Sequence, residues 1–241
     1  MLPPKSSYAK SSDEPQSSGF SQRRWIFPGA HHTSDTGVIP LCRAASGGYR
    51  AKAGKLACAT NKSKFARKKN IIMWFMLETE RLIIQPYSNS FLEEYYKEFT
   101  DEITKYQYPD SFSNINTANE IVSGFVKDME QGNMLELVIL TQEGEFIGSM
   151  EAFGIKEKTP EIGLWLKRSA HGKGYGYEAL KGLLDHLNAT GKYQYYIYEV
   201  DVRNVASIRL VEKFHFEKGG CEEITTESGK MLTLQTYHVF N

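Results

Sequence analysis

The chain has 241 residues, which is enough for one large domain or for a smaller domain with an extension. Its apolar share of 41% is ordinary for a globular protein, and no apolar run reaches the roughly 18–20 residues that span a bilayer. The longest run, IIMWFML at 71–77, is too short and too far from the N-terminus for a secretory signal.

The three cysteines, Cys42, Cys58 and Cys221, fit none of the Cys or Cys/His spacings that bind metals, and three thiols cannot all pair within one chain. His31 and His32 are adjacent, and we interpret them as surface histidines rather than metal ligands. We therefore expect a reducing, cytoplasmic setting and no metal site.

The net formal charge is zero, but the two signs are distributed unevenly along the chain. Residues 1–75 contain 13 of the 29 Lys and Arg and 3 of the 29 Asp and Glu, which leaves 16 basic and 26 acidic residues in 76–241. The first segment is therefore strongly basic and the second strongly acidic, with balances of +10 and −10.

Residues 1–70 are rich in Ser, Gly, Ala, Lys and Arg and have no sustained apolar period. Such a segment cannot bury enough apolar surface to offset the entropy lost on ordering. The stretch KSKFARKK is compatible with a basic arm for nucleic acid or anionic membrane, but the composition favours a disordered or non-native leader, with Met73 or Met76 as the biological start. We predict a leader at 1–75 and a domain at 76–241, with neither a membrane nor a nucleic-acid partner.

A strand and two helices open the predicted domain. ERLIIQPY at 80–87 alternates and is β-branched, which predicts a strand that ends at Pro86. The segments at 88–100 and 116–132 carry apolar residues at helical spacing, and Gly132 ends the second. Those apolar residues are Phe91, Tyr95 and Phe99 in the first helix and Ile121, Phe125 and Met129 in the second.

A meander of three strands follows, with QEGE as the hairpin loop between the first two. A glycine loop then leads into a helix that runs to about Asn188. A strand, a helix and two further strands complete the chain, so we predict a mixed α/β domain of about 165 residues. The meander strands are 134–140, 146–155 and 160–167, and the last elements are 193–202, 204–214, 216–220 and 231–240.

The stretch KRSAHGKGYGYEAL at 167–180 places three glycines on alternate positions directly before a helix. The first turn of a helix has unpaired N–H groups and a positive dipole end, and glycine lets a phosphate approach them. The P-loop pattern is absent because Lys173 is followed by Gly174, and the dinucleotide pattern lacks its third glycine. The stretch therefore predicts a phosphate site of another kind.

HGKGYG followed by YEAL resembles the coenzyme A pyrophosphate loop of the GNAT superfamily of N-acetyltransferases, Arg/Gln-x-x-Gly-x-Gly/Ala. In this resemblance His171 takes the Arg/Gln position, and Gly174 and Gly176 take the two glycine positions. Gly172 is an extra glycine that is common in the family. The exchange of Arg or Gln for His171 would weaken that side chain's contribution or make it pH-dependent.

Two further segments resemble the same superfamily. NVASIRLVEKFHF at 204–216 resembles the later motif, Asn-x-x-Ser/Ala followed by an apolar helix and Glu-Lys-x-Gly-Phe, with His215 in place of the glycine. LETERLIIQPY at 77–87 resembles the first strand of the RimJ/RimL-like ribosomal-protein N-terminal acetyltransferases, so the resemblance covers about 77–240. The residues that match the later motif are Asn204, Ser207, Glu212, Lys213 and Phe216.

The resemblance implies the GNAT acyltransferase fold, an α/β (α+β) architecture whose central mixed, mostly antiparallel sheet is flanked by helices. In this family the fourth and fifth strands, here PEIGLWLK and YIYEVDV, splay apart, and the pantetheine arm pairs with exposed strand backbone. The pyrophosphate then lies on the N–H groups of residues 171–176. The implied acetyl-CoA-binding residues are Leu166, Arg168, His171, Gly172, Lys173, Gly174, Tyr175, Gly176, Asn204 and Ser207.

In this family the amine attacks the thioester directly, without an acyl-enzyme, so the resemblance implies no catalytic thiol. We therefore interpret Cys221 as a structural or loop residue. As general base we predict Glu161, which opens its strand; Glu151 on the preceding strand is the alternative, acting through a water where needed. The backbone N–H near Leu166 is the predicted oxyanion donor. Many family members place a Tyr that acts as general acid seven residues beyond the motif's Asn, but this chain has Val211 there.

The −10 balance of the predicted domain would attract a cationic amine, such as a polyamine, an aminoglycoside-like antibiotic or a basic protein N-terminus. In the family the first helices form the acceptor wall, and they are acidic here, although a solvated helix face explains that more simply. We predict an acetyl-CoA-dependent N-acetyltransferase, monomeric or homodimeric, that acts on a protein N-terminus or a small-molecule amine. The alternatives are a non-catalytic CoA-binding sensor and an amine-antibiotic or polyamine acetyltransferase. The acidic residues of the predicted wall are Glu93, Glu94, Glu98, Asp101 and Glu102.

Overall fold

The computed structural model describes residues 75–240, and the predicted leader at 1–75 lies outside this range apart from Phe75. The strands are β1 (Leu77–Glu78), β2 (Leu82–Pro86), β3 (Met134–Thr141), β4 (Phe146–Phe153), β5 (Glu161–Leu166), β6 (Tyr196–Asp201), β7 (His215–Thr225) and β8 (Met231–Phe240). The helices are η1 (Asn89–Phe91), α2 (Leu92–Glu98), α3 (Asp101–Thr104), α4 (Ile115–Gln131), η2 (Arg168–Ala170), α5 (Tyr175–Asn188) and α6 (Val205–Val211).

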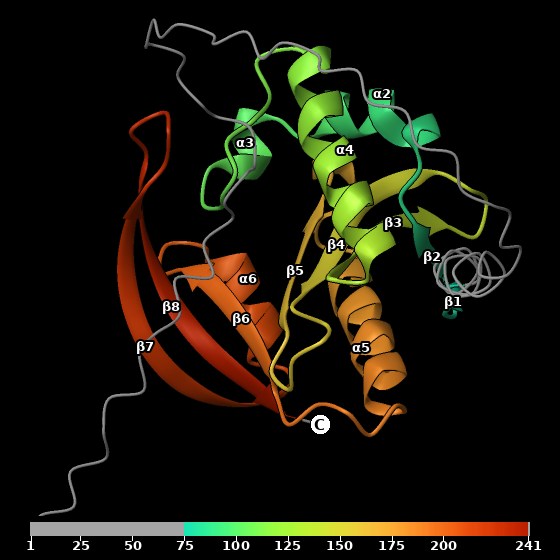
Figure 1. Cartoon of the computed structure of the whole chain (residues 1–241). Helices are drawn as coiled ribbons and strands as arrows, with labels where there is room; N and C mark the ends of the chain where they lie inside the picture. The colour runs from blue at the N-terminus through green and yellow to red at the C-terminus, as the bar shows by residue number, and fades with distance from the viewer. Residues whose placement is uncertain (1–74, 241) are drawn as a thin grey trace, which may run out of the picture. The chain divides into compact units, whose positions relative to one another are not determined.

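The strands form one eight-stranded sheet in the order β1-β2-β3-β4-β5-β6-β8-β7. Neighbouring strands are antiparallel except β5 and β6, which are parallel. Helices lie on both faces of the sheet (Figure 1). The predicted mixed, mostly antiparallel sheet is confirmed.

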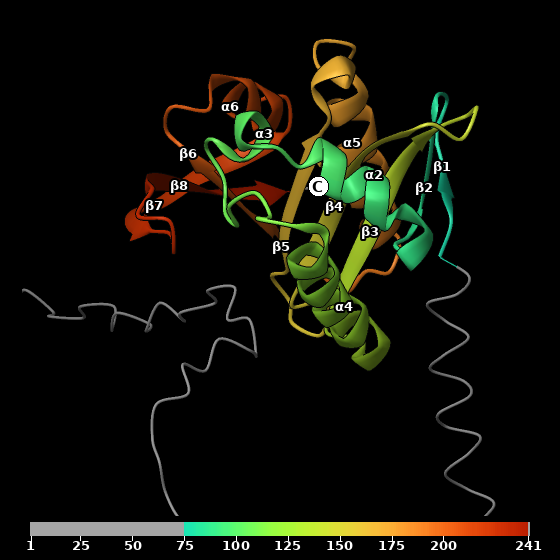
Figure 2. The ribbon, with the colours of Figure 1, turned by 90° about the horizontal axis from the view of Figure 1, so that it is seen from above.

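β3 lies inside the sheet and is buried along its whole length, because helices cover it on both sides. α2 and α4 pack on one face, here called the α2 face, and α5 packs on the other, the α5 face (Figure 2). Side chains alternate between the two faces of a strand. Trp165 of β5 accordingly lies on the α2 face, with its ring 5.0 Å from that of Tyr95 and 5.1 Å from that of Phe99.

The long helix α4 has a capping residue at each end, of which only Gly132 was expected from the sequence. The Asn114 side chain caps its N-terminus by accepting hydrogen bonds from the N–H groups of Asn116 and Thr117, both at 3.0 Å. Gly132 ends the helix in a left-handed conformation with φ 71°, which a residue with a side chain adopts only with strain. Both ends of the helix are therefore fixed, and α4 packs against β3 and α2 on the α2 face.

The structure differs from the prediction mainly at the ends of elements. The helix predicted at 88–100 is present as η1 and α2, which end before Phe99 and Thr100 leave helical geometry, and the short helix α3 that follows was not predicted. β7 continues to Thr225, five residues beyond its expected end, because this edge strand is mostly exposed and shows no apolar pattern. Cys221 consequently lies in a strand, where it is exposed, and not in a loop.

The parallel strands β5 and β6 meet at one end only. Their register contains the single pair Glu161 and Ile197, and the Ile197 N–H donates to the Pro160 carbonyl oxygen at 2.9 Å. β6 is paired along its whole length with β8 on its other side. The predicted splay of these two strands is therefore present, and it leaves the rest of the β5 edge without a strand partner among residues 75–240.

The turn between β7 and β8 is tied to the segment that follows α3 (Figure 1). Lys230 Nζ forms an ion pair with Asp110 Oδ1 at 2.7 Å and donates to the carbonyl oxygens of Thr104 and Gln107, both at 2.8 Å. This contact fixes the far end of the β7–β8 hairpin. Within the described range, no helix is both long and apolar enough to cross a membrane.

Replacing Lys230 by Met should destabilise the domain, because the ion pair and two carbonyl acceptors lose their common donor. We expect a loss of about 1–3 kcal/mol, or a fall in Tm of roughly 3–10 °C, by differential scanning fluorimetry. Lys181→Met is the matched control, since Lys181 makes an exposed ion pair with Asp185 within α5. Equal Tm values for the two variants would contradict the structural role of Lys230.

Candidate active site

The glycine loop between β5 and α5 leaves the start of α5 open. Gly172 and Gly174 have φ values of 74° and 84°, and Gly174 occupies the N-cap position without a side chain that could cap the helix. The first helical N–H with a backbone acceptor is that of Glu178, which donates to the Gly174 carbonyl oxygen at 3.2 Å. The N–H groups before it in the first turn are therefore available to an anion.

The loop is held in place by an ion pair with the first strand region. Arg81 Nε donates to Glu178 Oε2 at 2.7 Å, and Arg81 Nη1 donates to the Lys173 carbonyl oxygen at 3.0 Å. Thr79 Oγ1 and the Arg81 N–H both donate to Glu178 Oε1, at 2.6 and 2.8 Å. Burial opposes ionisation of Glu178, but these hydrogen bonds outweigh it and lower its pKa. The loop thus has a fixed conformation before any ligand arrives.

His171, which stands where the family motif has Arg or Gln, is turned back onto β5. Its Nε2 lies 2.8 Å from the Leu166 carbonyl oxygen, and Arg168 Nη1 lies 3.4 Å from its Nδ1. A carbonyl oxygen only accepts, so Nε2 carries the proton and Nδ1 accepts from Arg168. Arg168 also pairs with Glu102 of α3, with 3.1 Å between Nε and Oε1. His171 therefore joins the loop to the end of β5.

Gly176, in the first turn of α5, faces the splayed strands. A Cβ atom at this position would lie 3.5 Å from Leu210 of α6 and 3.6 and 3.7 Å from Leu164 and Leu166 of β5. All three leucines are half-buried. The helix start, α6 and the unpaired edge of β5 therefore converge at one place.

Backbone donors of β5 point toward this place. The Lys167 N–H donates to the Ile147 carbonyl oxygen at 2.8 Å, which continues the β4–β5 register beyond Leu166. Peptide groups alternate in direction along an antiparallel strand, so the N–H groups of Leu164 and Leu166 face away from β4, toward β6. The predicted donor at Leu166 thus lies on the unpaired edge.

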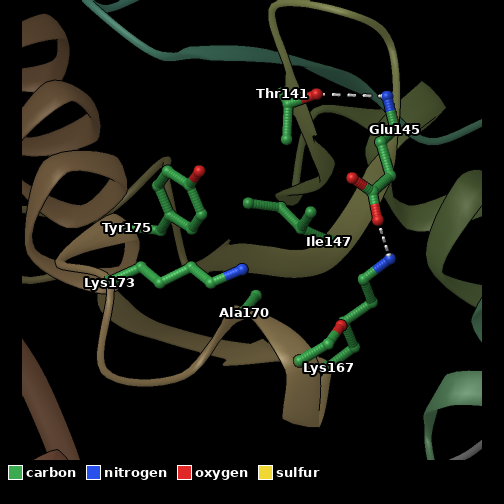
Figure 3. A pocket seen from close by; sticks show the side chains of 8 residues that line it. Thr141, Glu145, Ile147, Lys167, Ala170, Lys173 and Tyr175 are labelled. Atoms are coloured by element: carbon green, nitrogen blue, oxygen red, sulfur yellow. Dashed lines mark hydrogen bonds and ion pairs between the residues drawn. The ribbon is translucent and has the colours of Figure 1, made fainter.

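A small pocket lies beside the loop (Figure 3). Lys173 extends its amine into it below the ring of Tyr175, while Lys167 Nζ is paired with Glu145 Oε1 at 2.6 Å. The glycine loop therefore places the positive charge of Lys173 in this pocket. The pocket is lined by Thr141, Glu145, Ile147, Lys167, Ser169, Ala170, Lys173 and Tyr175.

The predicted residues of the later motif make contacts within the fold. Asn204 Oδ1 caps α6 by accepting from the Ser207 N–H at 3.2 Å. Ser207 Oγ lies 2.8 Å from the hydroxyl of Tyr198, which is buried in β6. Val211, where many family members have a tyrosine, is fully buried. A hydrogen-bonded pair of hydroxyl groups, those of Tyr198 and Ser207, thus joins β6 to α6.

A row of four residues crosses the sheet on the α2 face. Tyr87, which follows β2, donates its N–H to the Glu136 carbonyl oxygen at 2.9 Å. Glu136 of β3 is paired with Glu151 of β4, and Glu151 is paired with Gly163 of β5. Directly paired residues have their side chains side by side. Two carboxyl groups therefore lie next to each other, between a tyrosine and a glycine.

The absence of a side chain at Gly163 leaves the space that the Glu151 carboxyl group occupies. A Cβ atom there would lie 2.3 Å from Glu151 Oε1, which is far inside the contact distance. The carboxyl group of Glu151 consequently covers Gly163, at the first position of the α2 face beyond the joined end of β5. Glu161 lies on the same face at the joined end itself, where β5 and β6 still pair.

Glu136 is only 1% exposed, and its neighbours are polar groups of the α2 face. Ser149 Oγ lies 2.6 Å from Glu136 Oε1 and 2.7 Å from the Leu137 carbonyl oxygen. Burial raises the pKa of Glu136 to about 8, although hydrogen bonds from Ser149 and Tyr95 lower it in part. Burial raises the pKa of Glu151 well above its usual range, and ionisation of Glu136 would raise it further.

The acidic residues predicted for an acceptor wall lie mainly on exposed positions. Glu93 and Glu94 of α2 and Asp101 and Glu102 of α3 are exposed, while Glu98 is half-buried. In the described part of the chain, no group of three or more His, Cys, Asp or Glu side chains is placed to hold a metal ion.

The acetyltransferase (GNAT) domain family matches residues 81–217, which is more than half of the chain. The chain belongs to the GNAT family of acetyltransferases. The family match and the eight-stranded mixed sheet flanked by helices confirm the fold inferred from the sequence motifs.

Solved structures of this fold match nearly all of the GNAT domain at low identity. The ribosomal L7/L12 α-N-protein acetyltransferase RimL, in complex with coenzyme A, has 18% identity and a TM-score of 0.62, and covers 69% of this chain and 98% of its own. Mycobacterium smegmatis RimJ, with a CoA disulfide, has 18% identity and a TM-score of 0.59, with coverages of 66% and 81%. Spermidine N-acetyltransferase from Vibrio cholerae, with CoA and spermine, has 16% identity and a TM-score of 0.59, with coverages of 67% and 96%.

Two parts of this GNAT site were missed by sequence reasoning. The ion pair of Arg81 and Glu178 joins residues that both lie in motifs described above, but nothing in the amino-acid sequence indicates that they are in contact. Glu136 had a local signal, because it is the only charged residue in the apolar run MLELVIL. Burial of a single carboxyl group in an apolar strand costs free energy unless the group is hydrogen-bonded or paired. An acid at this position therefore indicated that Glu136 has polar neighbours or a function.

The pH dependence of stability should report the buried carboxyl groups. The pKa of Glu136 is about 8 in the folded state against an ordinary value of 4.5, so its contribution is fully present below about pH 4.5 and is lost as pH rises through 8. We expect the free energy of unfolding to fall across this window on the order of a few kcal/mol, measured by chemical denaturation.

Glu136→Gln should remove much of this decline, because a neutral amide replaces the titrating carboxyl group. Glu120→Gln, at an exposed position of α4, is the control and should follow the unmodified protein. A constant difference in stability between Glu136→Gln and the unmodified protein from pH 5 to pH 9 would contradict the raised pKa.

Proposed function

We propose that this GNAT domain transfers the acetyl group of acetyl-CoA to a primary amine by direct attack. The observation that carries the proposal is the open first turn of α5 beside the unpaired edge of β5. The turn offers N–H groups to a pyrophosphate, and the edge offers N–H groups to an extended amide-containing arm. Solved relatives of this fold contain coenzyme A, which supports the same ligand here.

The residues present fit coenzyme A in charge and in shape. The N–H groups of Tyr175 and Gly176 would receive the pyrophosphate, and Lys173 supplies a cation on the pocket side of the loop (Figure 3). The pantetheine arm would pair with β5 at Leu164 and Leu166. Asn204 and Ser207 are engaged within α6 and with Tyr198, so we assign them to the support of this region rather than to direct contact with the ligand.

We propose Glu151 as the general base in preference to Glu161. Its carboxyl group covers Gly163, where the β5 edge becomes free, and its raised pKa suits a group that must take a proton from an ammonium near neutral pH. In the reaction the ammonium gives one proton to Glu151, and the free amine attacks the thioester carbon and forms the C–N bond. The thioester C–S bond then breaks, the amine nitrogen gives up its second proton, and the leaving thiolate takes up one proton in balance. The N–H of Leu166 is the proposed oxyanion donor.

The hydroxyl of Tyr198, held by its hydrogen bond with Ser207, is the proposed donor to the leaving sulfur. Burial raises the pKa of Tyr198 to about 12, the hydrogen bond from Ser207 lowers it in part, and the charge of Glu151 raises it further. The phenol is therefore neutral at physiological pH and keeps its hydrogen for donation. It stands in place of the tyrosine that many family members carry where this chain has Val211.

For the acceptor we propose a cationic primary amine, either a protein N-terminus or a polyamine. The acidic balance of residues 76–241 would attract such a molecule, and similar folds act on a ribosomal protein and on spermidine. A panel of spermine, spermidine and a peptide with the N-terminal sequence of ribosomal protein L7/L12 distinguishes the two classes. Acetyl-CoA binding without turnover of any amine would favour a CoA sensor instead. A cytoplasmic location is part of the same proposal.

Gly176→Val should abolish the stabilisation by acetyl-CoA, because its methyl groups would fill the space between α5 and the leucines of β5 and α6. For the unmodified protein we expect a thermal shift that corresponds to about 2.7 kcal/mol at a hundredfold excess over Kd. Gly124→Val in α4 is the matched control, since nothing lies within 4 Å of a Cβ there. A full shift in Gly176→Val would place the ligand elsewhere.

Glu151→Gln should reduce kcat at least 100-fold with little change in the Kd of acetyl-CoA, because general bases contribute about 10²–10⁴-fold. Gly163→Ala should reduce kcat about 10-fold or more by displacing the Glu151 carboxyl group. Gly124→Ala, in a helix with free space, should keep full activity. An active Glu151→Gln and an inactive Glu161→Gln would transfer the role to Glu161.

A further inference from the structure

We propose that Glu136 is a positioning residue that keeps its proton at neutral pH, so that the Glu136–Glu151 pair carries a single negative charge, on Glu151. The proposal rests on the proposed role of Glu151 as base. It assigns Glu136 a task in the reaction although Glu136 is almost fully buried and is separated from the free edge of β5 by Glu151.

Both short contacts of Ser149 are satisfied when Glu136 carries a proton. Ser149 Oγ is within hydrogen-bond distance of two oxygen atoms, Glu136 Oε1 at 2.6 Å and the Leu137 carbonyl oxygen at 2.7 Å. A hydroxyl group has one hydrogen, and a backbone carbonyl oxygen can only accept. If Ser149 donates to Leu137, its contact with Glu136 is a hydrogen bond only when Glu136 donates. The protonated acid satisfies both contacts at once.

The pairing of the strands places the two carboxyl groups side by side. Glu136 and Glu151 are directly opposite in the antiparallel β3–β4 register, where Cβ atoms lie about 4.5–5.5 Å apart. Two ionised carboxylates at this spacing, shielded from water, repel strongly, and one of them retains a proton. Glu136 is the more buried of the two, since Glu151 is half-buried and covers Gly163 at the β5 edge. The charge therefore resides on Glu151.

The surrounding groups provide hydrogen bonds but no compensating cation. Tyr95 from α2 is fully buried beside both carboxyl groups and accepts from Trp165 Nε1 at 3.4 Å. The pKa of Tyr95 is raised well above 10 by burial and by the charges of Glu136 and Glu151. The other ionisable groups that face this cluster are Tyr87 after β2, Glu94 of α2, Glu161 of β5 and Tyr198 of β6. All of these groups are neutral or acidic, so a second negative charge on the pair would be uncompensated by them.

Packing alone does not explain an acid at position 136. Leucine or methionine would fill the same space in this otherwise apolar strand without the cost of desolvating a carboxyl group. The hydroxyl of Tyr87, its neighbour in the row, is also buried and has no hydrogen-bond partner within residues 75–240. Two costly polar groups, Tyr87 and Glu136, thus lie in the same row as the proposed base, and functional sites are where such costs are found.

This arrangement predicts two ionisations for the pair. The first gives the active form, with the proton on Glu136 and the charge on Glu151. The second, at higher pH, ionises Glu136 and places two charges together, which should displace Glu151 and lower the rate. Gln at position 136 imitates the protonated acid, since its amide donates to Ser149 but does not titrate. Leu removes both the donor and the charge.

Nuclear magnetic resonance of protein labelled at the Glu δ-carbon tests the proton directly. The signal assigned to Glu136 by its loss in Glu136→Gln should titrate with a midpoint above pH 7, and the midpoint should fall in Glu151→Gln because the neighbouring charge is gone. The signal of the exposed Glu120 is the internal control. A midpoint of 4–5 for Glu136 would overturn the proposal.

The proposed effect of Glu136 on the reaction is tested by measuring kcat against pH with spermine or the L7/L12 peptide as acceptor. The quantity compared is the ratio of kcat in Glu136→Gln to kcat in the unmodified protein. Taking the ratio removes the titration of the amine itself. We expect a value near 1 at pH 7 and a rise of severalfold above pH 8, while Glu136→Leu should lose at least tenfold at pH 7. A ratio that is flat with pH, or equal losses in the Gln and Leu variants, would overturn the positioning role.

The two proposals fail in different ways. A fully active Glu151→Gln would remove the base assignment and with it the reason for positioning that residue, whatever the midpoint of Glu136. An inactive Glu151→Gln with a low midpoint for Glu136 would leave the base in place and remove only the shared proton.

Discussion

The single residue pair that joins β5 to β6 is the constraint on which the rest of this structure depends. β6 is bound along its length to β8, and β5 is bound along its length to β4, so the two halves of the sheet meet only at Glu161 and Ile197. Beyond that pair the strands diverge, with α6 and the start of α5 at the divergence. A continuous sheet would saturate the N–H groups of Leu164 and Leu166; the divergence leaves them for a ligand.

The open helix start and the free strand edge are useful only if they are held in a fixed relation. The ion pair of Arg81 and Glu178 does this from outside, because it ties the glycine loop to the chain just before β2. His171 does it from inside, because its ring is bonded to the last carbonyl group of β5. A loop with two glycines in left-handed conformations would otherwise be free to close over its own N–H groups. Preorganisation of this kind lowers the entropy lost on binding.

The chemistry of the α2 face is set by burial. Glu136 and Glu151 lie next to each other in a sheet that is covered on both sides, so water stabilises the charge of Glu136 very little and that of Glu151 only in part. The same burial that makes the pair costly for folding raises its proton affinity into the range where a base for an ammonium group is effective. If Glu151 is the base, stability and function oppose each other at this pair, and the proposed retained proton would resolve the opposition. The glycine opposite Glu151 completes the arrangement by giving its carboxyl group space.

The sequence by itself determined the local features of this protein. The glycine spacing before α5, the apolar period of α4 with Gly132 at its end, and the alternation of β2 are visible in short windows, and three motifs in order were sufficient for the family and the fold. The tertiary structure alone decided which side chains meet. Glu136 faces Glu151 because of the β3–β4 register, which shifts at Ile139 and Leu140, and a slip of one residue would move a side chain to the other face. Arg81 and Glu178 are 97 positions apart, and no local pattern specifies a contact over that separation, because it follows from the packing of α5 against the sheet.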